Sequence, residues 1–156
     1  MASLEPLLLL AEQGDAHSQF KVGVAYSNSK GILQDLELGL AWYRLAADQG
    51  HAEAQYKLGF SYSHAEGVPK DDAKATAWYR LAADQGHADA QYILGNAYLN
   101  GEGIPQDKEA GAKWYHLAAD QGHVNAQHLL SSLYFLGEGV ACLLSSDHSH
   151  LEYGLL

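Results

Sequence analysis

The sequence contains one cysteine, few basic residues and no long hydrophobic run. Cys142 has no second thiol, so the chain offers neither an internal disulfide nor a metal site built on several thiolates. Nine Lys and Arg residues stand against nineteen Asp and Glu residues, which gives a formal net charge of −10 without a basic stripe. Such a chain repels polyanions, so nucleic acid is not an expected partner.

The N-terminal apolar run, residues 7–11, is too short for a membrane span, which needs about 20 apolar residues. Glu5 precedes this run and no cationic residue flanks it, so the pattern of an export signal is missing. We therefore expect no membrane span and a cytoplasmic protein. The 156 residues, 47% of them hydrophobic, suit one compact module.

A 36-residue repeat organises the chain. The dipeptide Trp-Tyr begins at Trp42, Trp78 and Trp114, and glycines and tyrosines recur at the same interval. Residues 41–56 and 77–92 are identical at fifteen of sixteen positions. Chance does not produce this agreement, so each unit should adopt the same structure.

Each unit contains two helical patterns separated by helix-terminating residues. Ala54, Leu58 and Tyr62 fall at steps of four and form one stripe on a helix. A second stripe contains Ala75, Trp78, Tyr79 and Ala82. Three aspartates suit helix N-termini and three glycines suit helix ends: Asp35, Asp71 and Asp107, and Gly50, Gly86 and Gly122. We predict seven helices over residues 15–136, with a shorter helix before them and no β-sheet, and tryptophans buried between the units.

The pattern G-H-A-x-A-Q-Y-x-L-G-x-x-Y, followed by G-x-G-(I/V)-P-x-D and A-x-W-Y-x-L-A-A-D-Q-G, resembles the Sel1-like repeat, a relative of the tetratricopeptide repeat. The resemblance covers about residues 4–140. It implies an all-α, right-handed superhelix of antiparallel helical hairpins, found often in bacteria, that works as a protein-binding scaffold. We expect a repeat solenoid over residues 1–140 and an irregular C-terminal tail over 141–156, where His150 and Leu151 replace the Trp-Tyr pair.

The recurring histidines do not indicate a metal site. His51, His87 and His123 are one repeat apart, which places them roughly 10 Å or more from one another in stacked hairpins. A zinc ion needs nitrogens about 2 Å away, so we assign these side chains to the turns. His148 and His150 lack a further ligand at matching spacing. No metal or cofactor is expected, and His116, which replaces Arg44 and Arg80, is interpreted as a surface substitution.

Catalysis is also not expected. Ser131 and Ser132 lie near His128, but no carboxylate is placed to orient that histidine. One alternative is an enzyme that binds or hydrolyses β-lactams, as described for cysteine-rich members of the resembling family. Those members carry a cysteine pair in each repeat, and this chain has Cys142 alone. A second alternative is a structural fragment of a larger assembly.

The resemblance places the far side of each Ala-Leu-Tyr stripe in a concave groove. We predict that this side binds a protein or peptide, because aromatic rings supply contact area at small entropic cost and amides hold a backbone. The residues are Phe20, Glu53, Tyr56, Phe60, His64, Asp89, Tyr92, Asn96, Asn100 and His128. Glu53 and Asp89 favour a partner with basic residues. A different interpretation, in which the rings of Phe20, Tyr56 and Tyr92 belong partly to the core, stays open.

The C-terminal end should need a cover. Leu129, Leu130 and Phe135 are among the apolar residues of the last predicted helix, and the helix expected to cover it has lost its aromatic pair. Either the tail leucines at 143, 144 and 151 fold back, or two copies associate weakly through this end. We favour a poorly ordered tail with weak self-association.

Overall fold

The computed structural model describes residues 4–28 and 34–135, and within those ranges every secondary-structure element is an α-helix. The helices are α1 (Glu5–Glu12), α2 (Ala16–Ser27), α3 (Leu36–Asp48), α4 (Ala52–His64), α5 (Asp72–Asp84), α6 (Ala88–Asn100), α7 (Lys108–Asp120) and α8 (Val124–Phe135). The predicted seven helices and the shorter helix before them are confirmed. The tail at 141–156, with Cys142, His148 and His150, lies outside the described residues.

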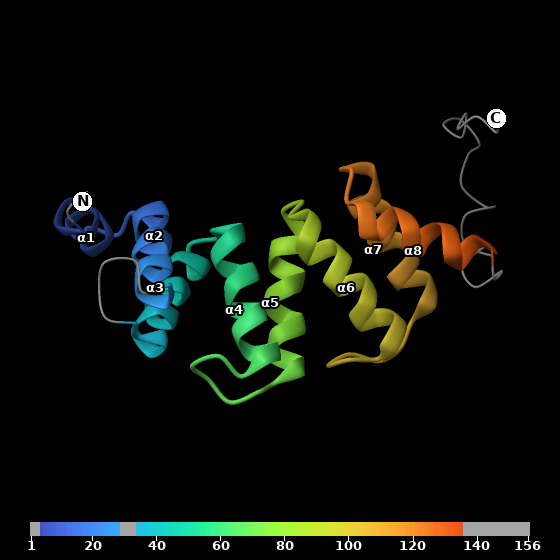
Figure 1. Ribbon diagram of the computed structural model, residues 1–156, viewed down its shortest axis with the longest axis horizontal. Helices are drawn as coiled ribbons and strands as arrows, with labels where there is room; N and C mark the ends of the chain where they lie inside the picture. Colours follow the sequence, from blue (N-terminus) through green and yellow to red (C-terminus); the bar gives the residue numbers. More distant parts are fainter. Residues whose placement is uncertain (1–3, 29–33, 136–156) are drawn as a thin grey trace.

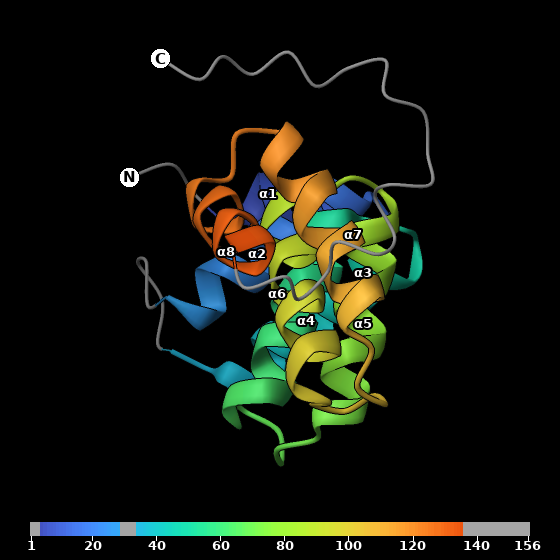
Figure 2. The same ribbon diagram turned by 90° about the vertical axis from the view of Figure 1, so that its right-hand side faces the viewer.

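The helices form a row of stacked hairpins. Figure 1 shows the row running from α1 to α8, and Figure 2 views it from the α8 end, so that the hairpins overlap one behind another. The most extensive contacts join α2 to α3, α4 to α5 and α6 to α7, and smaller contacts join each hairpin to the next. We call α2, α4, α6 and α8 the first helices, and α3, α5 and α7 the second helices. The all-α superhelix is confirmed, and no helix of the described ranges is long and apolar enough to cross a membrane.

Helix boundaries follow the repeated polar residues and glycines. Each second helix has an aspartate N-cap, as where the Asp71 carboxylate accepts the backbone N–H of Lys74 at 2.9 Å. The first helices α4 and α6 use histidine instead, with His87 Nδ1 accepting the N–H of Ala90 at 3.2 Å. Gly86 follows α5 with a φ of +88°, a left-handed conformation that glycine adopts without strain.

A tyrosine packed against a glycine joins the two helices of each hairpin. A Cβ atom added to Gly59 would lie 2.7 Å from the Tyr79 ring, so only glycine permits this approach. The same pairing joins Gly23 to Tyr43 and Gly95 to Tyr115. Tyr79 is 3% exposed, and burial raises its pKa to about 12. The close approach of the helices therefore depends on the second residue of each Trp-Tyr pair.

The tryptophans differ from the prediction that they are buried. Trp42, Trp78 and Trp114 are half-buried, whereas the tyrosine that follows each of them is in the core. Trp78 contacts two successive core clusters, one around Leu58 and the other around Leu94. It does lie between units, but part of its ring stays in solvent, because its position on α5 is turned one residue away from the glycine contact.

A relay of glutamine side chains links successive repeats. Gln85 Nε2 donates to Gln55 Oε1 at 2.7 Å, and Gln55 Nε2 donates to the carbonyl of Ala47 at 3.1 Å. The same two bonds recur from Gln49 through Gln19 to Ala11, and from Gln121 through Gln91 to Ala83. Gln55 is 4% exposed and keeps both ends of its amide bonded, so the polar group is buried without an unpaired atom.

Candidate functional site

The ten predicted binding residues lie on the first helices, and none is fully buried. We call them the column. Six are half-buried: Phe20, Glu53, Tyr56, Phe60, Tyr92 and Asn96. Four are exposed: His64, Asp89, Asn100 and His128. Phe20 also packs against the Leu58 cluster and Tyr56 against the Leu94 cluster. The rings are therefore partly core and partly accessible, so both interpretations of them apply.

In the first half of each of α2, α4 and α6, one aromatic ring of the column stacks on the histidine that precedes the next first helix. The centroids of the Tyr56 and His87 rings are 4.6 Å apart with an interplanar angle of 16°. Tyr92 stacks on His123 at 4.5 Å, and Phe20 stacks on His51 at 4.7 Å. This stacking restricts the rings before any partner arrives.

The same histidines bond to the column carboxylates. His87 Nε2 lies 2.9 Å from Glu53 Oε2, and His123 Nε2 lies 3.2 Å from Asp89 Oδ1. Because His87 Nδ1 accepts a backbone N–H, the proton is on Nε2, which donates to Glu53. The turn role predicted for the histidines is confirmed. The superhelix brings His87 and His123 against the preceding repeat, a contact that the sequence did not predict.

The column residues in the second halves of the first helices make less regular contacts. Phe60 stacks on His64 with centroids 4.0 Å apart. In the next repeat Asn96 replaces Phe60, and Asn96 Oδ1 accepts the hydroxyl of Tyr115 at 2.5 Å. One repeat earlier, Ser63 Oγ lies 3.1 Å from the Tyr79 hydroxyl, but Leu99 replaces that serine. Asn96 thus gives the Tyr115 hydroxyl the partner that it loses where leucine replaces serine at position 99. The two changes occur together in this repeat, and this is the signal in the sequence for the pairing.

The last described helix shows no arrangement for nucleophilic catalysis. Ser131 Oγ donates to the carbonyl of Gln127 at 2.9 Å, and Ser132 Oγ donates to the carbonyl of His128 at 3.0 Å. Both hydroxyls are therefore directed at their own backbone and not at the His128 ring. Within residues 4–28 and 34–135, no group of three or more His, Cys, Asp or Glu side chains is placed to hold a metal ion.

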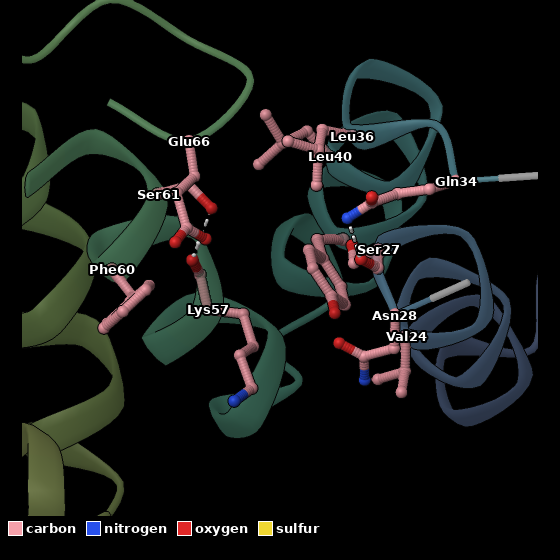
Figure 3. Close-up of a pocket in the computed structure, with 11 residues that line it drawn as sticks. Val24, Ser27, Asn28, Gln34, Leu36, Leu40, Lys57, Phe60, Ser61 and Glu66 are labelled. Carbon is pink, nitrogen blue, oxygen red and sulfur yellow. Dashed lines mark hydrogen bonds between the residues drawn. The ribbon is translucent and has the colours of Figure 1, made fainter. Parts of the chain in front are cut away.

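A cavity beside the column lies between the first two hairpins and was not predicted. Its volume is about 440 Å³. Figure 3 shows Val24 and Asn28 of α2 and Leu40 of α3 on one side, with Lys57 and Phe60 of α4 opposite them. Val24, Asn28 and Phe60 share the register of the column, so the cavity extends the candidate surface inward.

A second cavity of about 190 Å³ lies one repeat further along. Its lining repeats that of the first at an interval of 36 residues, with Ser63, Tyr79 and Glu102 in place of Ser27, Tyr43 and Glu66. Other positions change character: Thr76 replaces Leu40, and Ile93 replaces Lys57. The two cavities share one architecture but present different chemistry.

His116 keeps a hydrogen bond that arginine makes in the two preceding repeats. Arg44 donates to the Tyr62 hydroxyl at 2.5 Å, and Arg80 bonds to Tyr98 in the same way. His116 is hydrogen-bonded to the Tyr134 hydroxyl at the equivalent position. Burial lowers the pKa of His116, and Asp120 opposes this only in part. His116 therefore replaces arginine without loss of the hydrogen bond to tyrosine.

Comparisons with known proteins agree on one architecture. The family model of the Sel1 repeat matches residues 16–51, 52–87, 88–123 and 124–141. A Sel1 repeat protein from Oxalobacter formigenes is 36% identical, with a TM-score of 0.80, over 85% of this chain and 99% of that one. A protective antigen of uropathogenic Escherichia coli with an SLR fold is 40% identical, with a TM-score of 0.84, over 88% of this chain and 29% of that one. Cysteine-rich protein B of Helicobacter pylori, at 19% identity and a TM-score of 0.67, shares the fold alone. No curated protein matches the chain.

Proposed function

The chain belongs to the Sel1 repeat family, and from this membership we propose that it is a scaffold whose column binds an extended peptide segment of another protein in the concave groove. Proteins with this repeat generally serve protein interaction and not catalysis. The family supplies the class of activity, and the residues of the column supply the expected specificity.

The contrast between packing and column positions supports this proposal most directly. The Gly-Tyr contact and the glutamine relay recur unchanged through three hairpins. At two column positions, however, His64 becomes Asn100 and Tyr92 becomes His128. A partner lying along the column would meet a different surface at each repeat, and specificity can reside in those differences.

The contacts indicate how a peptide would be held. Tyr56 and Tyr92 are stacked and half-buried, so they offer rigid contact area at little entropic cost. The first cavity, with Leu36 and Leu40 in its wall, suits an apolar side chain of the peptide. Glu53 and exposed Asp89 favour Lys or Arg beside it, and association with such a segment should slow as salt rises.

The test needs a partner obtained by affinity capture and identified by mass spectrometry, followed by titration of the purified partner. We expect Tyr56→Ala to weaken binding by about 2 kcal/mol, and Tyr92→Ala likewise, if they are hot spots. Tyr98→Ala, which alters a half-buried tyrosine of α6 outside the column, is the matched control. Circular dichroism must show that each variant is folded. Unchanged affinity of the double variant Tyr56→Ala, Tyr92→Ala would contradict a binding site in the column.

We also propose weak self-association through α8. Phe135 is 91% exposed, although the equivalent Leu99 packs against the core cluster of α7 and α8, the helices that follow it. Leu129 and Tyr134 add exposed apolar area on the same helix. Sedimentation should show association that rises with concentration and disappears in Phe135→Ser. A strict monomer at high concentration would contradict this proposal.

A further inference from the structure

A row of exposed leucines follows the helices that do not carry the column. Leu45, Leu81 and Leu117 occupy equivalent positions of α3, α5 and α7 and are 48%, 47% and 47% exposed. Leu9 has the same register on α1 and is 57% exposed. We call these four residues the leucine row. The alanine that follows each leucine in α3, α5 and α7 is fully buried, so the helices turn these leucines toward solvent and away from the core.

The leucine row persists where its neighbours change. Four residues before each leucine stand Glu5, Ala41, Ala77 and Lys113, and one residue before it stand Leu8, Arg44, Arg80 and His116. The position of the row itself is leucine in every case. A solvated helix surface has no need of leucine, and repeated exposed apolar side chains in one register are typical of an interaction surface.

An acidic residue ends each helix of the row. These residues are Glu12, Asp48, Asp84 and Asp120, each three positions after its leucine and each exposed. The last turns of α1, α3, α5 and α7 contain no basic residue. Arg44 and Arg80 stand four residues before Asp48 and Asp84, but they bond to the hydroxyls of Tyr62 and Tyr98. Asp120 attracts His116, but no hydrogen bond or ion pair joins these two described residues. A carboxylate at a helix C-terminus is unfavourable, because the backbone carbonyls there already carry partial negative charge. The same unfavourable choice made four times indicates a role other than local stability.

We propose that the leucine row is a docking surface for an amphipathic, basic helix of a partner protein. The helices α3, α5 and α7 pack mainly on the first helices between them, so successive leucines are separated by at least one interhelical distance, which is usually about 8–10 Å. An amphipathic helix lying along the row presents a continuous apolar stripe, because its apolar residues recur every three to four positions, and this stripe reaches successive leucines. Lys or Arg residues flanking that apolar stripe meet the carboxylates.

Charge selects this occupant over two others. A second copy of the chain carries the same carboxylates along its own row, so a row-to-row contact brings like charges together. An anionic membrane surface meets the same repulsion. A basic helix is attracted by the charge that repels both, and its binding does not involve the column.

The test uses a labelled synthetic helix of about four heptads with Leu at the a and d positions and Lys at e and g. Fluorescence anisotropy follows its titration with the full chain. We expect saturable binding that weakens about tenfold or more in the triple variant Leu45→Gln, Leu81→Gln, Leu117→Gln. Glutamine keeps the helix propensity of leucine, so these helices should still form. Leu38→Gln, which alters an exposed leucine of α3 outside the row, is the matched control and should bind like the unaltered chain.

Two further measurements separate specific docking from charge attraction. A peptide of the same composition with its leucines out of heptad order should not bind. The variant Asp48→Asn, Asp84→Asn, Asp120→Asn should retain binding with a reduced dependence on salt. Absence of saturable binding, equal binding by the triple leucine variant, or loss of self-association on changing the row would overturn the proposal.

Discussion

Ala65 shows at the residue scale how one repeat position can be locally strained. It ends α4 with φ 57° and ψ 36°, and within the described ranges it is the only residue other than glycine with positive φ. One repeat later Gly101 holds the same place with φ 73° and ψ 34°. A Cβ atom in this conformation costs about 1–2 kcal/mol, so the two repeats differ in the stability of one turn.

Exchanging the two residue types should therefore act in opposite directions. We expect Ala65→Gly to raise the free energy of unfolding by about 0.5–1 kcal/mol, the released strain being reduced by the greater freedom of glycine in the unfolded chain. Gly101→Ala should lower it by about 1 kcal/mol, because space is available but the conformation is strained. Urea unfolding measures both. Equal shifts of the same sign would show that the strain is not local.

Two histidines couple stability to pH at the same scale. Burial lowers the pKa of His116 and of His51, and for His51 nearby His17 adds to the effect. The unfolded chain therefore takes up these protons first as the pH falls. Their contribution to stability is complete above a pH of about 6.5 and is lost progressively below it.

The substitution His116→Arg tests this coupling with the residue that the other repeats use. Arginine stays charged and bonds to tyrosine in those repeats, so the variant should lose less stability than the natural chain between about pH 7 and pH 5. Urea midpoints at several pH values measure the difference. Asp15 and Asp71 do not interfere, because their lowered pKa values act at more acidic pH. Parallel pH curves for the two proteins would contradict the assignment.

At the element scale, the stability of each hairpin depends on how its two helices pack against each other. In each hairpin the ring of a buried tyrosine lies against a glycine of the first helix, while the adjacent tryptophan stays partly in solvent. The tyrosine thus fixes how closely the two helices approach, and the tryptophan covers the boundary with the neighbouring hairpin.

Replacing Tyr79 and Trp78 by alanine, one at a time, should show that the tyrosine contributes more to stability than the tryptophan. We expect Tyr79→Ala to cost about 3–5 kcal/mol, as for other large side chains removed from a core. Trp78→Ala should cost less, about 2 kcal/mol, because part of its ring remains hydrated in the folded state. Denaturant melts of both variants provide the comparison. A larger loss for Trp78→Ala would mean that the boundary between hairpins, and not the hairpin itself, dominates stability.

At the scale of the whole molecule, the glutamine relay connects each hairpin to the next through buried hydrogen bonds. Gln55 joins Ala47 of one hairpin to Gln85 of the following one, and the arrangement recurs along the row. Gln127 keeps its bond to the carbonyl of Ala119 but is exposed on α8. Glutamine at this position of the repeat is therefore buried on α4 and exposed on α8.

Replacing Gln55 and Gln127 by alanine, one at a time, should show how burial changes the cost of losing the same hydrogen bond. We expect Gln55→Ala to lower the free energy of unfolding by about 1–3 kcal/mol, because the buried Ala47 carbonyl loses its partner away from water. Gln127→Ala should change it by less than about 0.5 kcal/mol, since water can replace the exposed bond. Thermal and urea unfolding of both variants give the result. Equal losses would show that burial is not what makes the relay costly to break.

The sequence by itself determined the helices and their order. A 36-residue period, aspartate caps and glycine ends are local signals, and α2 to α8 follow them because each signal acts within one or two turns of backbone. The stripe of Ala54, Leu58 and Tyr62 also identified the buried face of α4. Function followed as a class, through the family pattern, because packing residues are what the repeats share.

Only the tertiary structure decided what the chemistry-bearing side chains contact. The stacking of His87 on Tyr56, the bond from Asn96 to Tyr115 and the cavities between hairpins all join residues of different helices. Their geometry depends on how one hairpin is rotated against the next, which no local pattern encodes. The half-burial of Trp78 has the same cause. Periodicity places a residue on a helix face, but the superhelical packing determines how much of that face the next repeat covers.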